Sequence, residues 1–305
     1  MKSSRNKTIN FSLEDGQKYL SLCKKESDEK EIKPNALVIG DVFASLKKIA
    51  DNSIDLLIVD PPYNLDKSFH GNGFKKMNES DYADYTREWI KAVVPKLTKN
   101  ASIYVCCDWE SALSIGPILK EFFILRNRIT WQREKGRGAK TNWKNSMEDI
   151  FFATVSNDYK FNLSKVMQRK KVLAPYKENG KPKDWEQTKD GKFRNTCPSN
   201  FWDDIAVPYW SMAENTAHPT QKPEKLIAKL ILASSNEGDV VLDPFGGSGT
   251  TAVVCQKLGR KYISLEQNPL YSAWGAYRLE LAKQDPTIQG YKDGVFWERN
   301  SQQKP

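Results

Sequence analysis

The sequence contains few cysteines and no long apolar run, and both features limit the class of protein to which it can belong. Its 305 residues include five cysteines, an odd number without the paired spacing of a metal site or a disulfide framework. Cys106 and Cys107 are adjacent in an apparent strand, which predicts buried thiols and a reducing, cytoplasmic setting. No stretch approaches the roughly 18 apolar residues of a membrane helix. Residues 1–16 also lack the apolar core of a secretory signal.

Positive charge is concentrated in the middle of the chain. The net charge is +9, and residues 126–144 carry many Lys and Arg residues against the single acid Glu134, with Trp131 and Trp143 among them. Residues 165–194 form a second basic stretch. A solvated surface is one interpretation of such runs. Two basic segments with interleaved aromatic residues favour a polyanionic partner instead.

The hydrophobic pattern alternates between strands and helices over most of the chain. We expect strands at residues 36–40, 54–59, 102–106, 124–131, 147–155, 240–242 and 262–265. We expect helices at residues 41–49, 80–97, 109–121, 223–236, 250–258 and 269–283. This alternation predicts an α/β fold with a single doubly wound, mostly parallel sheet.

Three segments fall outside the alternation. Residues 1–34 are polar, with a short helix expected between residues 12 and 24, and form an N-terminal extension. Residues 64–79 are rich in Asn, Gly and Lys, which predicts a mobile loop. Residues 156–217 are basic, contain several Pro and Gly and show no clear helical or strand period, so we expect an insertion or a subdomain there.

The stretch VVLDPFGGSGTTAVV, residues 240–254, combines a strand, a glycine turn and the start of a helix. Gly247, Gly249 and Ala252 fit the G-x-G-x-x-A pattern of dinucleotide sites, and Glu266 ends the next strand, where it can accept from ribose hydroxyls. A nicotinamide enzyme and a purely structural turn both fit this motif. Asp243, however, would place negative charge beside a pyrophosphate. A cationic nucleoside without phosphate, such as S-adenosyl-L-methionine, suits these acids better.

The stretch LLIVDPPYN, residues 56–64, ends a buried strand on an acid and two prolines. Methylation of a base amino group requires acceptors that pull its hydrogens out of the ring plane. The Asp60 carboxylate and the Pro61 carbonyl supply two acceptors, fixed in place because proline restricts the backbone. Tyr63 offers a ring on which a flipped base can stack. A plain rigid turn is the alternative interpretation.

Three motifs occur in an order that resembles that of the β-class amino DNA methyltransferases. They are DPPY at residues 60–63, HPTQKPEKL at 218–226 and DPFGGSGTT at 243–251. The resemblance covers residues 37–284. It implies a Rossmann-like methyltransferase sheet with permuted motif order over residues 35–305, and a target-recognition region inserted at about residues 156–217. It also implies S-adenosyl-L-methionine as cofactor.

The resemblance implies roles for individual residues. The catalytic residues would be Asp60, Pro61, Pro62 and Tyr63. The cofactor-binding residues would be Asp41, Asp60, His218, Thr220, Lys222, Asp243, Phe245, Gly246, Gly247, Ser248, Gly249, Thr250, Thr251 and Glu266. A turn residue that leads into the next helix is an equally good interpretation of His218. The DNA-binding residues would be Arg133, Lys135, Arg137, Lys140, Lys144, Arg169, Lys170 and Lys171.

The identity of the target base is predicted from Asp60, the first residue of the tetrapeptide. An acid there is typical of the adenine enzymes of the resembling family, so Asp60 favours the 6-amino group of adenine, with the 4-amino group of cytosine as runner-up. Methylation of RNA or protein, and a non-catalytic DNA-binding role, are further alternatives. The expected partner is double-stranded DNA, in restriction-modification or epigenetic marking. A homodimer and a cognate restriction endonuclease are compatible with the family, and the expected location is the cytoplasm, at the nucleoid.

Overall fold

The computed structural model describes residues 4–65, 67–69, 72–133, 140–173 and 175–298. At its centre lies a nine-stranded sheet. From edge to edge its strands are β1 (Lys24–Lys25), β2 (Ala36–Ile39), β16 (Lys261–Glu266), β15 (Val240–Asp243), β3 (Ile54–Val59), β6 (Leu97–Cys107), β8 (Met147–Thr154), β7 (Ile124–Gln132) and β14 (Phe201–Trp202). Within this described sheet, β8 runs antiparallel to both of its neighbours and the other pairs are parallel.

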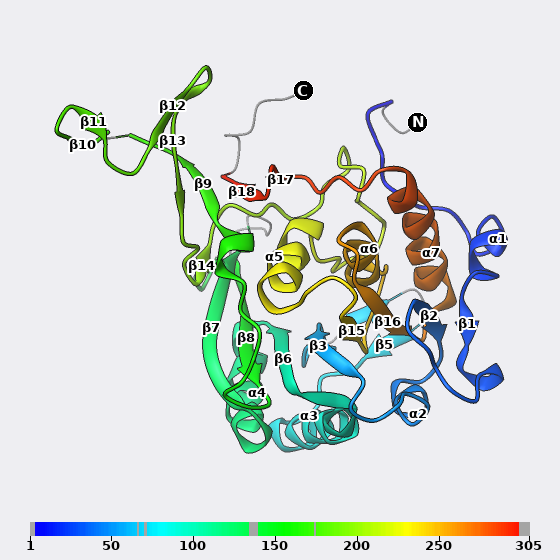
Figure 1. The fold of residues 1–305 in the computed structure, drawn as a ribbon. Coiled ribbons are helices and arrows are strands. Elements are labelled where there is room, and N and C mark those ends of the chain that lie inside the picture. The colour runs from blue at the N-terminus through cyan, green and yellow to red at the C-terminus, as the bar shows by residue number, and fades with distance from the viewer. Residues whose placement is uncertain (1–3, 66, 70–71, 134–139, 174, 299–305) are drawn as a thin grey trace.

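Helices cover both faces of the sheet (Figure 1). One face packs against α2 (Val42–Leu46), α3 (Glu79–Val93) and α4 (Trp109–Phe122), and the other against α5 (Glu224–Ser234), α6 (Thr250–Lys257) and α7 (Pro269–Gln284). Alternate residues of β3 enter the two cores, Leu57 and Val59 on the first face and Leu56 and Ile58 on the second. This two-sided burial explains the unbroken apolar run of β3. The predicted doubly wound α/β fold is confirmed.

Side-chain caps fix where several helices begin. Asp41, Asn78 and Asp108 accept hydrogen bonds from backbone N–H groups in the first turns of α2, α3 and α4. Asn268 does the same for α7, which continues with a proline at its first position. Each cap satisfies a donor that the helix itself leaves without a partner. Asp41 and Asn268 follow strand ends, so their caps also fix the chain at the carboxyl edge of the sheet.

A second, five-stranded sheet lies beside the first one, and the sequence pattern did not predict it. Its strands are β12 (Glu186–Thr188), β13 (Gly191–Thr196), β9 (Gln168–Lys171), β18 (Val295–Trp297) and β17 (Tyr291–Lys292). The strands are short and largely exposed, so they show no apolar alternation. This is why residues 156–217 show no clear helical or strand period in the sequence although they contain strands.

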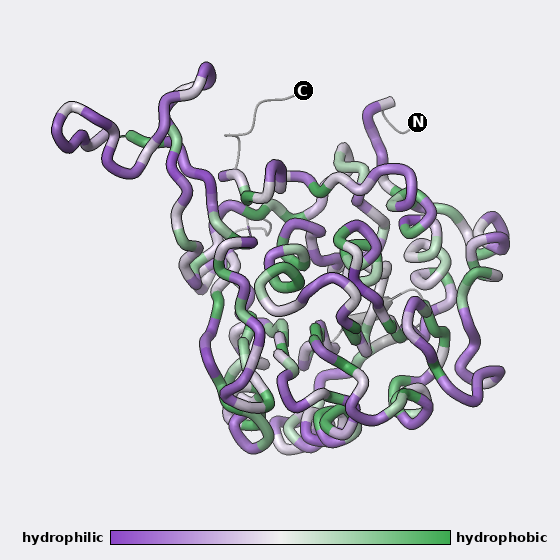
Figure 2. Tube along the Cα trace, in the orientation of Figure 1, coloured by the Kyte–Doolittle hydropathy of each residue, from purple (hydrophilic) through white to green (hydrophobic). Residues whose placement is uncertain are grey.

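The second sheet combines distant parts of the chain. β9 and β13 come from the predicted insertion, whereas β17 and β18 come from the C-terminal residues. The hairpins around β12 and β13 and around β10 (Lys177–Glu178) and β11 (Lys181–Pro182) project from the body of the molecule, and Figure 2 shows that they are mainly hydrophilic. A buried ion pair at 2.6 Å between Lys225 and Asp204 joins α5 to the end of the insertion. Lys225 also donates to the Trp297 carbonyl.

The remaining segments pack around this frame. Ile9 and Phe11 contact Trp274 and its neighbours on α7, and α1 (Gln17–Leu20) lies in the segment where a short helix was expected. The short 3₁₀ turns are η1 (Glu26–Asp28), η2 (Val94–Lys96) and η3 (Leu163–Val166). β4 (Lys67–Phe69) and β5 (Asn72–Phe74) pair as a hairpin within residues 64–79, where the sequence predicted a mobile loop.

Two smaller expectations concern burial and membranes. Cys106 and Cys107 are buried on β6, as predicted. Among the described residues, none of the helices combines the length and the apolar character needed to cross a bilayer.

Candidate active site

A cavity of about 390 Å³ opens at the carboxyl edge of the large sheet. Four acids stand where four neighbouring strands end: Asp41 after β2, Glu266 on β16, Asp243 on β15 and Asp60 after β3. Because these strands are parallel, their carboxyl ends share one edge, where ligands bind in open α/β sheets. The fold therefore gathers around one cavity acids that lie as much as 225 residues apart in sequence, from Asp41 to Glu266.

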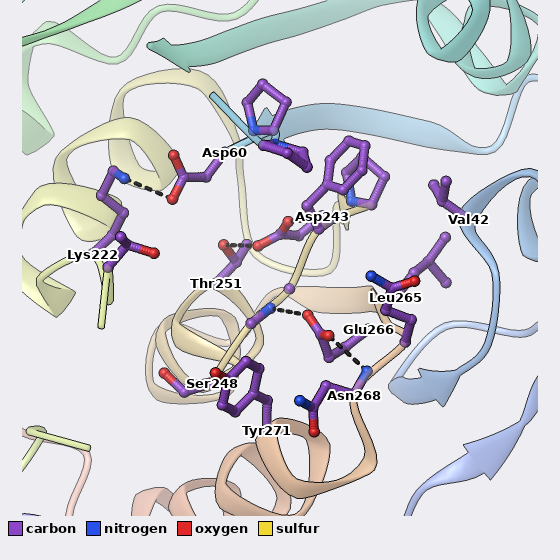
Figure 3. Close-up of a pocket in the computed structure, with 18 of the residues that line it drawn as sticks. Val42, Asp60, Lys222, Asp243, Ser248, Thr251, Leu265, Glu266, Asn268 and Tyr271 are labelled. Carbon is purple, nitrogen blue, oxygen red and sulfur yellow. Dashed lines mark hydrogen bonds and ion pairs between the residues drawn. The ribbon is translucent and has the colours of Figure 1, made fainter. Parts of the chain in front are cut away.

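Asp243 is held rigidly at the base of the glycine loop (Figure 3). Its Oδ2 accepts the Thr251 hydroxyl at 2.6 Å, and its Oδ1 accepts the Phe245 N–H at 3.1 Å. Burial raises the pKa of Asp243 to about 6, although these two hydrogen bonds favour the carboxylate. The side chain is thus a fixed acceptor whose charge depends on what enters the cavity.

Glu266 holds the other side of the same loop. Its carboxylate accepts the N–H groups of Gly247 and Asn268, each at 2.8 Å (Figure 3). Burial raises the pKa of Glu266 to about 7, against the opposing effect of these hydrogen bonds. Gly247 has a φ of 52°, a conformation that glycine adopts without strain.

The glycine loop is also fixed from behind by residues that the sequence analysis missed. Arg278 on α7 donates to the Ser248 carbonyl at 2.9 Å and to the Thr250 hydroxyl at 3.0 Å. Its guanidinium is paired at 3.0 Å with Glu224 on α5, which also binds Lys257 at 2.7 Å. No local pattern marks Arg278, because an arginine in a helix is ordinarily solvent-exposed.

The DPPY tetrapeptide lies beside this loop, and Asp60 makes two contacts there. Its Oδ1 accepts the Tyr63 hydroxyl at 2.8 Å, and its Oδ2 lies 2.6 Å from the Lys222 ammonium. Figure 3 shows Lys222 and Asp60 pointing toward each other. Burial, followed by the charges of Asp60 and Glu148, raises the pKa of Tyr63 well above its usual range, so this phenol is neutral.

A second, smaller cleft of about 130 Å³ adjoins Tyr63. Its lining residues are Tyr63, Leu65, Asp108, Arg133, Asn145, Met147 and Glu148. Glu148, on β8, is buried and lies 3.3 Å from both the Tyr63 hydroxyl and the Lys222 ammonium, while Arg133 pairs with its other oxygen. Glu148 is a second residue that the sequence analysis missed, since it lies near the start of β8 with no motif around it.

The HPTQKP segment completes the cavity wall. His218, Thr220 and Lys222 all line it. The His218 ring packs edge-on against Tyr271 with 4.5 Å between ring centroids, and its Nδ1 accepts the Thr220 N–H at 3.3 Å. The structure thus brings the predicted catalytic and cofactor residues together around one cavity. Gly249 is the exception, because it lies behind the loop against α7.

The predicted DNA-binding residues fall into different environments. Lys140, Lys144 and Lys171 are exposed, and Lys135 and Arg137 lie outside the described residues. Arg169 is instead packed within the small sheet, with its guanidinium 5.3 Å from the Phe193 ring centroid and 5.5 Å from that of Trp297. Lys170 lies 3.5 Å from Glu298. Arg133 borders the smaller cleft through its pairing with Glu148.

Comparison with known proteins identifies a protein family that matches this chain. The family model described as DNA methylase matches residues 54–275. The chain is 36% identical over 253 residues to the DNA adenine methyltransferase YhdJ of Escherichia coli K12, covering 81% of this chain and 83% of that protein. It is 33% identical to the type II methyltransferase M.HpaI of Haemophilus parainfluenzae, covering 80% and 74% of the two chains.

Solved structures show the same fold at lower sequence identity. The PvuII DNA methyltransferase, described as cytosine-N4-specific, superposes with a TM-score of 0.60 at 22% identity, over 81% of this chain and 87% of that one. The M1.HpyAVI complex with S-adenosylmethionine superposes with a TM-score of 0.51 at 21% identity, over 80% and 98%.

Proposed function

The chain belongs to the DNA methylase family, and from that premise we propose that it methylates the 6-amino group of adenine at specific sites in duplex DNA. The coarser activity, methyl transfer to an amino group of a DNA base, follows from the membership itself. One observation carries the proposal. The Asp60 carboxylate, which can accept from such an amino group, lines the same cavity as Asp243 and Glu266.

The cavity suits S-adenosylmethionine, which supplies this family with an activated methyl group. This cofactor is a cation with a nucleoside and no phosphate, and the cavity offers it carboxylates and a glycine backbone. A pyrophosphate would instead meet Asp243 and Glu266 as like charges. We assign ribose contacts to Glu266, adenine contacts to Asp41 and contacts at the methionine end to His218 and Thr220. The cavity volume of about 390 Å³ is typical of small-molecule sites.

The tetrapeptide supplies the groups that the reaction needs from the protein. An exocyclic amino group is a poor nucleophile because its lone pair is delocalised into the ring. In our proposal Asp60 and the Pro61 carbonyl accept hydrogen bonds from its two N–H groups. These hydrogen bonds turn the lone pair of the nitrogen toward the methyl donor. The Tyr63 ring supports the base, which must leave the duplex to reach the cavity. The Tyr82 hydroxyl donates to the Pro62 carbonyl at 3.1 Å and so helps to fix the tetrapeptide.

Adenine is the proposed base because an acid heads the tetrapeptide, as in the adenine enzymes of the resembling family. The similarity to a DNA adenine methyltransferase from Escherichia coli supports this choice. The 4-amino group of cytosine is the second candidate, since the fold is shared with a cytosine-N4-specific enzyme.

We further propose that the basic middle region holds the DNA. Lys140, Lys144 and Lys171 are exposed and free of the packing that surrounds Arg169, so they are suited to phosphate contacts. The order of the motifs, with DPPY before the recognition region and the glycine loop after it, supports assignment to the β class. A homodimer, a cognate restriction endonuclease and a place at the nucleoid are further parts of the proposal.

The test is to identify the methylated nucleoside. The purified protein is incubated with tritiated S-adenosylmethionine and plasmid DNA, and the DNA is digested to nucleosides. We expect label in 6-methyladenosine. Label in 4-methylcytosine would show that the target base is cytosine, and the proposed geometry of the site would remain unchanged. Absence of label from several DNAs, by a protein that binds the cofactor, would contradict the DNA substrate and direct the search to RNA and protein.

A further inference from the structure

The Lys222 ammonium lies among three protein oxygens. It lies 2.6 Å from Asp60 Oδ2, 3.2 Å from the Tyr63 hydroxyl and 3.3 Å from Glu148 Oε2. The contacts with Asp60 and Tyr63 are hydrogen bonds, and the contact with Glu148 is an ion pair. The Lys222 side chain is 7% exposed. The ammonium is therefore directed at protein oxygens of the tetrapeptide and β8, whereas the sequence predicted a cofactor contact for this residue.

Lys222 separates two carboxylates that come from different parts of the sheet. Asp60 follows β3, and Glu148 lies on β8. Burial works against the charged ammonium, but the charges of Asp60 and Glu148 outweigh it and raise the pKa of Lys222 above its usual value. Arg133 pairs with the other Glu148 oxygen. Two cations thus balance two carboxylates, and without Lys222 only Arg133 would remain to balance both of them.

The same contacts fix the orientation of Asp60 and leave it able to accept. Lys222 occupies one site on Oδ2, and the Tyr63 hydroxyl occupies one on Oδ1. Each carboxylate oxygen has a second lone pair. Both oxygens of Asp60 thereby keep an acceptor site for an incoming amino hydrogen, on a carboxylate that cannot rotate.

We infer that Lys222 and Glu148 form a clamp that positions Asp60 for the amino group of the base, and that Lys222 is not a ligand of the cofactor. Lys222 is then a positioning residue, and Glu148 is the second carboxylate that keeps its ammonium in place. The inference rests on the proposed amino-methyltransferase function, and it assigns a role to Glu148 that no sequence motif marks.

The test separates cofactor affinity from turnover. The variants are Lys222→Met, Glu148→Gln and the double variant, with Lys283→Met on the exposed side of α7 as a matched control. Binding of tritiated S-adenosylmethionine is measured at equilibrium, and kcat is measured at saturating cofactor and DNA. For Lys222→Met we expect a cofactor Kd within about twofold of wild type and a kcat lower by about 100-fold, the usual effect of a misplaced reacting group. The control should match wild type in both.

The double variant probes the charge balance. Removing the charge of Glu148 relieves the repulsion of Asp60, so Lys222→Met with Glu148→Gln should recover at least about tenfold in kcat over Lys222→Met alone. If Lys222→Met instead weakens cofactor binding and leaves kcat at saturation unchanged, Lys222 is a cofactor ligand and the inference is wrong. Absence of recovery in the double variant would also overturn it.

Two further outcomes keep the test decisive. If Lys222→Met fails to fold, as judged by its melting curve, Glu148→Gln alone decides: we expect several-fold lower kcat with unchanged cofactor affinity, and a wild-type kcat would contradict the clamp. The proposed function fails in a different way. A wild-type protein that binds the cofactor but labels no DNA would contradict the DNA substrate before any variant is compared.

Discussion

Gly249, at the head of α6, packs directly against Gly275 in the middle of α7. A Cβ atom on Gly249 would lie 2.9 Å from the Gly275 Cα, closer than real Cβ contacts. Gly249 also has a φ of 75°, in the left-handed region. These two requirements explain the third glycine of the loop: it lets the glycine loop and α6 approach α7, and it does not line the cavity.

The first prediction follows from this contact. Gly249→Ala should lose about 1–2 kcal/mol from the left-handed backbone and a further 1–3 kcal/mol, roughly, from overpacking against Gly275. Gly238 is the matched control, because it has a φ of 82° and an added Cβ would meet no atom within 4 Å. Gly238→Ala should lose only the backbone contribution. Urea unfolding of both variants measures the difference, and equal losses would contradict the packing argument.

The second prediction concerns Asp60. Asp60→Ala should abolish detectable methyl transfer, a loss of at least about 100-fold in kcat, because a hydrogen-bond acceptor for the amino group is removed. Cofactor affinity should change by far less, since Asp243 and Glu266 lie on other strands. Single-turnover kinetics and equilibrium binding of labelled cofactor check the two halves. Full activity in Asp60→Ala would exclude its proposed catalytic role.

The third prediction concerns pH. Glu266 has a pKa of about 7, raised from an ordinary value of 4.5, so its contribution to the stability of the cofactor-free protein is present below about pH 4.5 and is lost as pH rises through about 7. The pH dependence of cofactor affinity has the opposite sign, because the ionised Glu266 carboxylate is a better hydrogen-bond acceptor than the protonated one. Affinity for S-adenosylmethionine should therefore rise from about pH 5.5 to about pH 8.

A variant distinguishes the two carboxylates. In Glu266→Gln the midpoint of this rise should move down toward about 6, the pKa of the remaining Asp243. Isothermal titration calorimetry across this pH range measures the affinity and the protons released. An unchanged midpoint in Glu266→Gln would show that another group is responsible.

The fourth prediction concerns the buried pair behind the glycine loop. Arg278 and Glu224 are 2% and 6% exposed at their side chains. Arg278→Met should lose about 3–5 kcal/mol of stability, because it leaves Glu224 buried with one partner fewer. Lys283 pairs with Glu280 on the exposed part of the same helix, and Lys283→Met should change stability by less than about 1 kcal/mol. Denaturant unfolding compares the two, and similar losses would contradict a structural role for the buried pair.

The fifth prediction separates DNA contacts from packing. The double variant Lys140→Ala, Lys144→Ala should weaken DNA binding and reduce the slope of log affinity against log salt by about 2, one for each lost phosphate contact. Arg169→Ala should chiefly lower the melting temperature, because Arg169 packs against Phe193 and Trp297. Fluorescence anisotropy at several salt concentrations checks the first half. An unchanged slope in the lysine variant would remove that loop from the DNA-binding surface.

Local patterns identified seven of the nine strands of the large sheet, and the two-residue edge strands β1 and β14 were not predicted. β3 has the predicted bounds. The observed ends of β2, β15 and β16 each differ from the predicted ends by one residue. These strands are buried on both faces, so continuous apolar runs identify them. The small sheet was missed because its strands are short and exposed, and because β17 and β18 join it from the far end of the chain.

The site divides along the same line. The chemistry offered at the strand ends can be predicted from contiguous residues, because DPPY and the glycine loop are each continuous in sequence and their residue types restrict the backbone locally. The contact of Lys222 with Asp60 from 162 residues away, the ion pair of Glu148 with the same ammonium and the support of the loop by Arg278 arise only when the elements pack together. The reason is physical: such contacts depend on how strands and helices pack against one another, and no single stretch of sequence carries that information.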